Sequence, residues 1–220
     1  MPIAFRWFVF GLLAAVAAPA AAQDKGAARD EVAEILSAVV RVKAKALPDA
    51  RSIATLGAER EGSGALVREG YVATIGYLVI EAESIEVTGA DGRSVPAALA
   101  GYDHASGLAL LKVLAPLAGT PLALGNASAL AERAPALVAS WGGGDNVSLV
   151  NVVSRRPFSG SWEYLLEAAI FTYPPVMNWS GAALIGGKGE LLGLGSLIVA
   201  DAAGNTAGGT QAPGNMFVPA

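Results

Sequence analysis

The sequence predicts an all-β protein built from two six-stranded β-barrels. Short runs rich in Val, Ile, Leu and Tyr recur at regular intervals along the chain. Glycine-containing turn signals separate these runs, for example Arg68-Glu69-Gly70 and Ala90-Asp91-Gly92. A helical pattern occurs only near the start. Regularly spaced short strands with few helices favour barrels or sandwiches over a parallel α/β sheet.

The N-terminal segment predicts export. Arg6 precedes an apolar run over Trp7–Ala18, and small residues follow up to Ala22. A basic start, a short apolar run and a small-residue end form a secretory signal peptide, and the run falls short of the roughly 20 residues that span a bilayer. We therefore expect residues 1–22 to be a signal peptide cleaved after Ala22. The remaining chain is expected to be periplasmic or secreted, without a membrane span.

The rest of the chain divides into two strand-rich halves. Residues 23–37 are expected to form an N-terminal segment with a short helix over 30–37. Residues 38–115 are expected to form the first barrel, 116–134 a connector and 135–220 the second barrel. The expected strands are Ala38–Ala44, Gly64–Arg68, Tyr71–Thr74, Ser84–Thr88, Val95–Tyr102, Leu108–Leu114, Ala136–Trp141, Val147–Arg155, Glu163–Phe171, Gly181–Ile185, Glu190–Val199 and Gly214–Val218.

The composition excludes several classes of function. The chain has no cysteine and one histidine, His104, so disulfides, thiolate metal sites and a multi-histidine zinc site are excluded. A net charge of −4 without a basic cluster argues against nucleic-acid binding. The glycine run 142–144 lacks the Lys-Ser/Thr of a phosphate-binding loop. We therefore expect no cofactor and no metal.

Several segments, in this order and at this spacing, resemble the HtrA/DegP-type branch of the trypsin-like serine proteases. They are Val39–Val42, Gly62–Val67, Gly70–Thr74, Ala90–Arg93, Gly101–Asp103, Leu108–Val113, Ser180-Gly181, Gly189–Leu194 and Met216–Pro219. The resemblance implies a trypsin-like fold, with two perpendicular barrels and an active-site cleft between them. Because the chain ends soon after Pro219, the PDZ domain common in that family is expected to be absent.

The resemblance also implies a degenerate catalytic triad. A serine protease needs an attacking serine, a histidine base and an aspartate that orients the histidine. Ser180 stands at the serine position, Tyr77 stands where the family has histidine, and Gly107 stands where it has aspartate. A phenol with an ordinary pKa near 10 is a poor base at neutral pH. We expect the Tyr77 ring to be buried in the space left by the histidine.

The residues before Ser180 depart from the family as well. Asn178 replaces a glycine whose backbone turn forms the oxyanion hole, so Asn178, Trp179 and Ser180 make the corresponding loop. Asparagine tolerates left-handed backbone angles, so this turn can in principle be kept. The prolines at 174 and 175 stiffen the loop and remove N–H donors. The sequence leaves open whether the loop keeps a productive shape.

Three functions are compatible with these residues. The leading one is an inactive protease homologue that binds an extended peptide or an unfolded protein segment in the cleft. An alternative is a divergent endopeptidase that uses Ser180 with an unusual base. Three residues are candidates for that base: His104, Lys112 and Lys188. They are expected on a loop, a strand and a turn, and none has a route to the cleft. A third is a subunit that docks onto an active protease relative.

Overall fold

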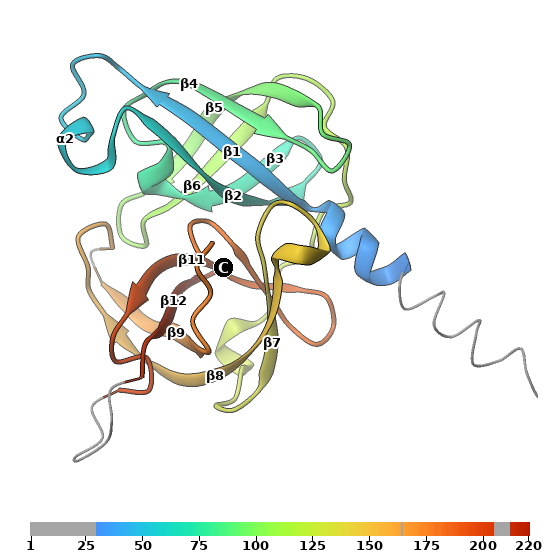
Figure 1. The fold of residues 1–220 in the computed structure, drawn as a ribbon, viewed down its shortest axis with the longest axis vertical. Coiled ribbons are helices and arrows are strands. Elements are labelled where there is room, and N and C mark those ends of the chain that lie inside the picture. The colour runs from blue at the N-terminus through green and yellow to red at the C-terminus, as the bar shows by residue number, and fades with distance from the viewer. Residues whose placement is uncertain (1–29, 164, 205–211) are drawn as a thin grey trace, which may run out of the picture. The chain divides into compact units, whose positions relative to one another are not determined.

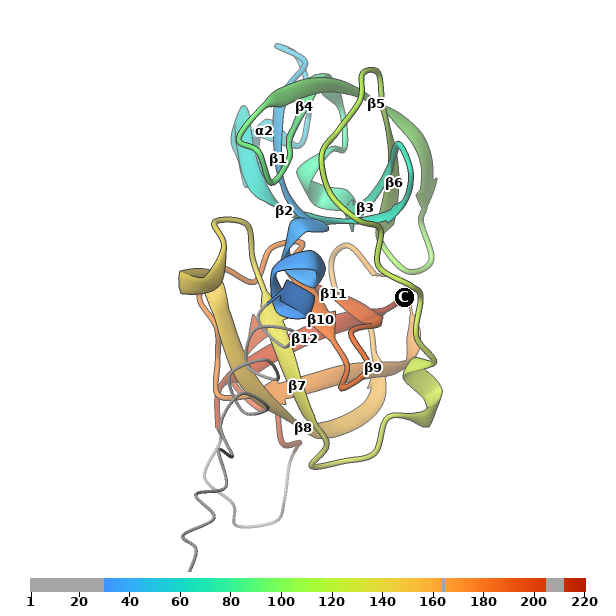
Figure 2. The same ribbon diagram turned by 90° about the vertical axis from the view of Figure 1, so that its right-hand side faces the viewer.

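The computed structural model describes residues 30–163, 165–204 and 212–220. The predicted signal peptide lies outside these residues. Residues 30–37 are helical, as predicted, and residues 33–220 form one compact unit. That unit contains two β-barrels, formed by the first and second halves of the chain (Figures 1 and 2). No helix in the described ranges is long and apolar enough to cross a membrane.

The two barrels have the same strand order. The first closes as β1-β2-β3-β6-β5-β4 and the second as β7-β8-β9-β12-β11-β10, with antiparallel pairing throughout. The strands are β1 (Val39–Ala46), β2 (Glu59–Arg68), β3 (Tyr71–Ile75), β4 (Ala82–Thr88), β5 (Ser94–Asp103), β6 (Leu108–Val113), β7 (Pro135–Ala139), β8 (Val147–Phe158), β9 (Leu166–Tyr173), β10 (Ala183–Ile185), β11 (Leu191–Val199) and β12 (Gly214–Pro219). The predicted all-β fold with two six-stranded barrels is confirmed.

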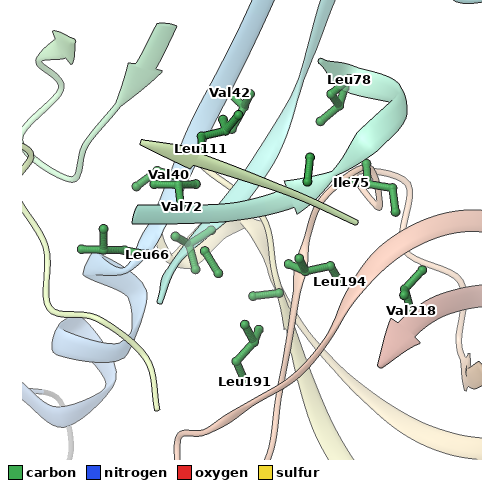
Figure 3. Close-up of a cluster of buried hydrophobic side chains, with 14 of the residues drawn as sticks. Val40, Val42, Leu66, Val72, Ile75, Leu78, Leu111, Leu191, Leu194 and Val218 are labelled. Atoms are coloured by element: carbon green, nitrogen blue, oxygen red, sulfur yellow. The ribbon is translucent and has the colours of Figure 1, made fainter. Parts of the chain in front are cut away.

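Alternation along the strands builds the core. In β1, Val40 and Val42 are buried, whereas Lys43 and Lys45 between the buried positions face solvent. Figure 3 shows side chains of the first barrel near others from β11 and β12. The labelled residues are Val40, Val42, Leu66, Val72, Ile75, Leu78, Leu111, Leu191, Leu194 and Val218, which belong to one apolar cluster. The contact between the barrels is therefore part of the hydrophobic core.

The structure corrects some predicted boundaries. β10 begins at Ala183 and not at Gly181, because Gly181 has a left-handed φ of 69° that breaks the strand. β9 begins at Leu166, so Glu163 lies in the preceding loop and not in the strand. The structure also contains short helical turns that the sequence did not predict: α2 (Ile53–Leu56), η1 (Gly76–Leu78), η2 (Ala127–Ala129) and η3 (Gly144–Asn146). Of these, η1 carries Tyr77 into the candidate site.

Candidate functional site

Ser180 lies in the loop between β9 and β10. The next residue, Gly181, turns the backbone, and its N–H donates to the carbonyl of Gly195 at 2.8 Å. The N–H of Ala182 donates to the carbonyl of Trp179 at 3.0 Å. The first bond anchors the loop to β11, the second closes the turn around Ser180, and the Ser180 side chain is partly exposed.

Strand β2 of the first barrel packs against this loop. The N–H of Ser63 donates to the Ser180 carbonyl at 2.8 Å. A Cβ at Gly62 would lie 2.8 Å from the Ser180 carbonyl oxygen, and one at Gly181 would lie 1.9 Å from the Ser63 carbonyl oxygen. Glycine on both sides therefore permits the close approach that places Ser180 at the boundary between the barrels.

Tyr77 reaches Ser180 across that boundary. Its hydroxyl oxygen lies 2.9 Å from Ser180 Oγ and 2.9 Å from the carbonyl oxygen of Ser196. A phenol has one proton to donate, and a carbonyl can only accept. When Tyr77 donates to Ser196, the Ser180 hydroxyl is left to donate to the phenol oxygen. The structure thus brings together Ser180 and Tyr77, the two residues predicted from the motifs.

The surroundings of Tyr77 keep it protonated. Burial raises the pKa of Tyr77 to about 12, the hydrogen bond with Ser180 partly opposes this, and the negative charge of Glu163 adds to the rise. The indole of Trp162 packs against the phenol, with 6.0 Å between ring centroids. At neutral pH the group facing Ser180 is therefore a neutral phenol.

The raised pKa of Tyr77 predicts a loss of stability at alkaline pH. Unfolding returns the phenol to its ordinary pKa of about 10, so between about pH 10 and about pH 12 the unfolded chain releases a proton that the folded chain keeps. The contribution of protonated Tyr77 to the free energy of unfolding is complete below pH 10. It falls by up to about 3 kcal/mol as the pH rises toward 12. Urea unfolding across this range should show a smaller alkaline loss for Tyr77→Phe. The exposed Tyr173→Phe is the matched control, and an equal effect of both variants contradicts the prediction.

Gly107 has no room for a side chain. It adopts a φ of 76°, and a Cβ there would lie 2.9 Å from the carbonyl oxygen of Trp162 and 3.6 Å from Cγ of Glu163. Its own carbonyl accepts the N–H of Gly76 at 2.7 Å, next to Tyr77. The loop between β8 and β9 therefore covers position 107 from the second barrel.

Asn178 does not adopt the left-handed turn that its sequence allows. Within the described ranges, the non-glycine residues with positive φ are Glu81 and Arg133. The carbonyl of Asn178 accepts the hydroxyl of Ser140 at 2.6 Å, which holds the residue against the second barrel. The backbone N–H groups of Asn178 and Ser180 donate to no acceptor among the described residues.

Two hollows flank Ser180. One of about 330 Å³ is lined by Trp141 and Met177, and one of about 420 Å³ by Tyr77, Trp162 and Leu197. The side chains of Glu61, Trp179 and Ser180 line both. Trp141 is partly exposed at this cleft, and the Arg41 guanidinium lies over its ring at 5.2 Å from the centroid.

The other ionisable candidates lie away from Ser180. His104 is exposed and packs on Tyr102, with 4.6 Å between ring centroids. Lys112 on β6 and Lys188 before β11 are also exposed, and none of the three lines either hollow. In the part of the chain that the structure describes, no group of three His, Asp or Glu side chains could hold a metal ion.

Comparison with known proteins identifies the family. The family described as "Trypsin-like peptidase domain" matches residues 62–194. The chain belongs to this family. That match runs from Gly62 in β2 to Leu194 in β11, so it includes Tyr77 and Ser180, which meet at the boundary between the barrels.

Curated relatives of this trypsin-like domain are HtrA/DegP-type proteases. The periplasmic pH-dependent serine endoprotease DegQ of Escherichia coli K12 is 32% identical over 160 residues, covering 70% of this chain and 35% of DegQ. The periplasmic serine endoprotease DegP of Salmonella typhimurium is also 32% identical, with 34% of its length covered. The chain thus spans about a third of the length of these relatives. The predicted membership of the HtrA/DegP-type branch is confirmed.

Solved structures confirm the chymotrypsin-like fold. The HtrA-type protease AlgW with a tripeptide has a TM-score of 0.66 and 23% identity, covering 87% of this chain and 59% of AlgW. AlgW with a decapeptide has a TM-score of 0.63 and 22% identity, covering 87% of this chain and 63% of AlgW.

Sequence reasoning missed two residues of the site in this trypsin-like domain. Glu163 is only 1% exposed, and its carboxylate accepts a hydrogen bond from the hydroxyl of Ser196. Ser196 in turn offers its carbonyl to Tyr77 and to the indole N–H of Trp179, the latter at 3.2 Å. No spacing in the sequence signals this pair, because Glu163 belongs to a loop and Ser196 to a distant strand.

Proposed function

We propose that this trypsin-like domain is an exported, catalytically inactive protease homologue that binds an extended peptide or an unfolded protein segment. The observation that carries the proposal is the Tyr77 hydroxyl, 2.9 Å from Ser180 Oγ, where a serine protease needs a base. Gly107, proposed to stand at the aspartate position, offers no side chain to orient a base.

The chemistry of a phenol supports the absence of catalysis. With a pKa of about 12, only about one Tyr77 in 10⁵ is ionised at pH 7. A neutral phenol cannot take the serine proton as the nucleophile attacks. In subtilisin, loss of the histidine alone lowers turnover by about 10⁶-fold. Ser180 therefore retains a nucleophile's position without the group that would activate it.

The cleft supports peptide binding. β11 continues to Val199, whereas its pairing with β10 ends at Leu194 and Gly195 bonds to the turn at Gly181 and Ala182. Residues 197–199 therefore have no ladder partner on that side within the described ranges. An extended peptide can add to such an edge through main-chain hydrogen bonds. The hollows on either side of Ser180 offer space for its side chains. AlgW, which has the same fold, was solved with a tripeptide and a decapeptide, which supports peptides as the ligand class.

Two observations support an extracytoplasmic location. Residues 1–22 have the three parts of a secretory signal peptide. The curated relatives DegQ and DegP are described as periplasmic.

Binding of unfolded casein tests the peptide-binding proposal. Met177, 71% exposed, lines the smaller hollow, and Leu149, 67% exposed on β8, lines neither of the two that flank Ser180. We expect Met177→Lys to weaken casein binding by about tenfold, the equivalent of one lost apolar contact. Leu149→Lys introduces the same charge at similar exposure and should leave the Kd unchanged. Fluorescence anisotropy of labelled casein measures both.

Two results contradict the proposed ligand or its site. Absence of casein binding to the unmodified chain rejects an unfolded protein as ligand and favours docking onto an active relative. Equal weakening by Met177→Lys and Leu149→Lys shows that binding does not use the cleft beside Ser180.

A further inference from the structure

Glu163 is a buried acidic side chain beside the candidate site. It is 1% exposed, Oε1 accepts the Ser196 hydroxyl, and Oε2 has no hydrogen-bond partner among the described residues. An ionised carboxylate loses solvation energy on burial, and the loss must be offset by partners or serve a function. No Lys or Arg forms an ion pair with it in the described part of the chain.

The position of Glu163 is defined by two contacts with the site. Its Cγ lies 3.6 Å from the place that a Cβ of Gly107 would occupy. Ser196 links it to Tyr77, because the Ser196 hydroxyl donates to Glu163 while the Ser196 carbonyl accepts the Tyr77 hydroxyl. The preceding residue, Trp162, packs its ring on Tyr77. Glu163 therefore lies beside Gly107 and is connected to Tyr77 through Ser196.

We propose that Glu163 supplies, from the second barrel, the carboxylate that Gly107 does not supply from the first. This inference rests on the proposed correspondence of Tyr77 and Gly107 with the histidine and aspartate positions. It makes Glu163 a positioning residue for the side chain at position 77. The site then lacks a base but already holds the carboxylate that a base would need.

The native tyrosine and a histidine introduced at position 77 respond to that carboxylate in opposite ways. A phenol ionises to an anion, which a neighbouring negative charge disfavours, and Glu163 accordingly contributes to the raised pKa of Tyr77. An imidazole ionises to a cation, which the same charge stabilises. In the present chain Glu163 therefore helps to keep Tyr77 protonated, and with histidine it would raise the pKa of the base.

The pKa of an imidazole introduced by Tyr77→His tests the proposal. His104 is the only native histidine, so NMR titration resolves two imidazoles, with His104→Asn for assignment. We expect Tyr77→His/Glu163→Gln to have an imidazole pKa at least about one unit below that of Tyr77→His, as expected for loss of a nearby buried negative charge. Tyr77→His/Glu61→Gln is the matched control, because Glu61 lines the cleft but is exposed and paired with Arg41 at 2.7 Å. It should change the pKa by no more than a few tenths of a unit.

An unchanged imidazole pKa after Glu163→Gln overturns the proposal, as does an equal fall after Glu61→Gln. If Tyr77→His does not fold, tyrosinate absorbance in Glu163→Gln and in the unmodified chain replaces the NMR titration. The pKa of Tyr77 should then fall after Glu163→Gln, and an unchanged value overturns the proposal. Neither readout depends on activity, so reactivity of Ser180 in the unmodified chain would reject the proposed inactivity without affecting this result.

Discussion

Gly181→Ala is expected to lower the free energy of unfolding by more than about 4 kcal/mol. Two effects combine at this position. The φ of 69° is strained for any residue with a Cβ, and the new Cβ would lie 1.9 Å from the backbone carbonyl oxygen of Ser63. The carbonyl belongs to β2 and cannot move aside as a flexible side chain can. Relief requires separating the Ser180 loop from the first barrel, which breaks the 2.8 Å bond between Ser63 and Ser180.

Gly187→Ala is the matched control for this prediction. Gly187 lies in the turn before β11, has no atom within 4 Å of an added Cβ and needs no left-handed φ. Its replacement should change the free energy of unfolding by less than about 1 kcal/mol. Urea unfolding of both variants measures the difference, and similar values would contradict the close contact between the Ser180 loop and β2.

Tyr77→His is expected to increase the rate at which a fluorophosphonate probe labels Ser180 by about 10³-fold. Loss of the histidine from a serine protease costs about 10⁶-fold, so restoring a base offers a gain of that order. Loss of one oxyanion-hole donor costs about 10²- to 10³-fold. Because Asn178 lacks the left-handed turn, we expect only part of the gain.

Two double variants define the origin of that gain. Tyr77→His/Ser180→Ala should show no labelling, which assigns the reaction to Ser180. In Tyr77→His/Glu163→Gln the labelling rate of Ser180 should fall toward that of the unmodified chain, because the imidazole loses the group that orients it. If Tyr77→His is no more reactive than the unmodified chain, the missing base is not what keeps Ser180 inert.

The strands and the two motif residues could be predicted from sequence because their signals are local. Short apolar runs and glycine turns placed most strand bounds within about three residues of the observed ones, although β2 begins at Glu59 and not at the predicted Gly64. The Thr74-to-Tyr77 segment and the Ser180-Gly181 pair could be aligned with the family by motif, and the structure places Tyr77 and Ser180 in hydrogen-bond contact.

The remaining features of the site depend on tertiary contacts that carry no local signal. Glu163 was assigned to a strand because it precedes an apolar run, but its position is set by Ser196 and by the space above Gly107. Asn178 could adopt left-handed backbone angles, but its φ is not positive in the structure, where its carbonyl accepts the Ser140 hydroxyl. The contact between Arg41 of β1 and the Trp141 ring likewise joins distant segments without a local signal.

Labelling of the unmodified protein with a fluorophosphonate probe, alongside incubation with unfolded casein, tests the central claim most directly. Ser180→Ala is the control, because it removes one oxygen from a partly exposed side chain. We predict no labelling of Ser180 and no casein cleavage beyond that of Ser180→Ala, since Tyr77 stays protonated at neutral pH. Labelling and cleavage that disappear in Ser180→Ala would contradict the inactive state and show that Ser180 is activated by another base.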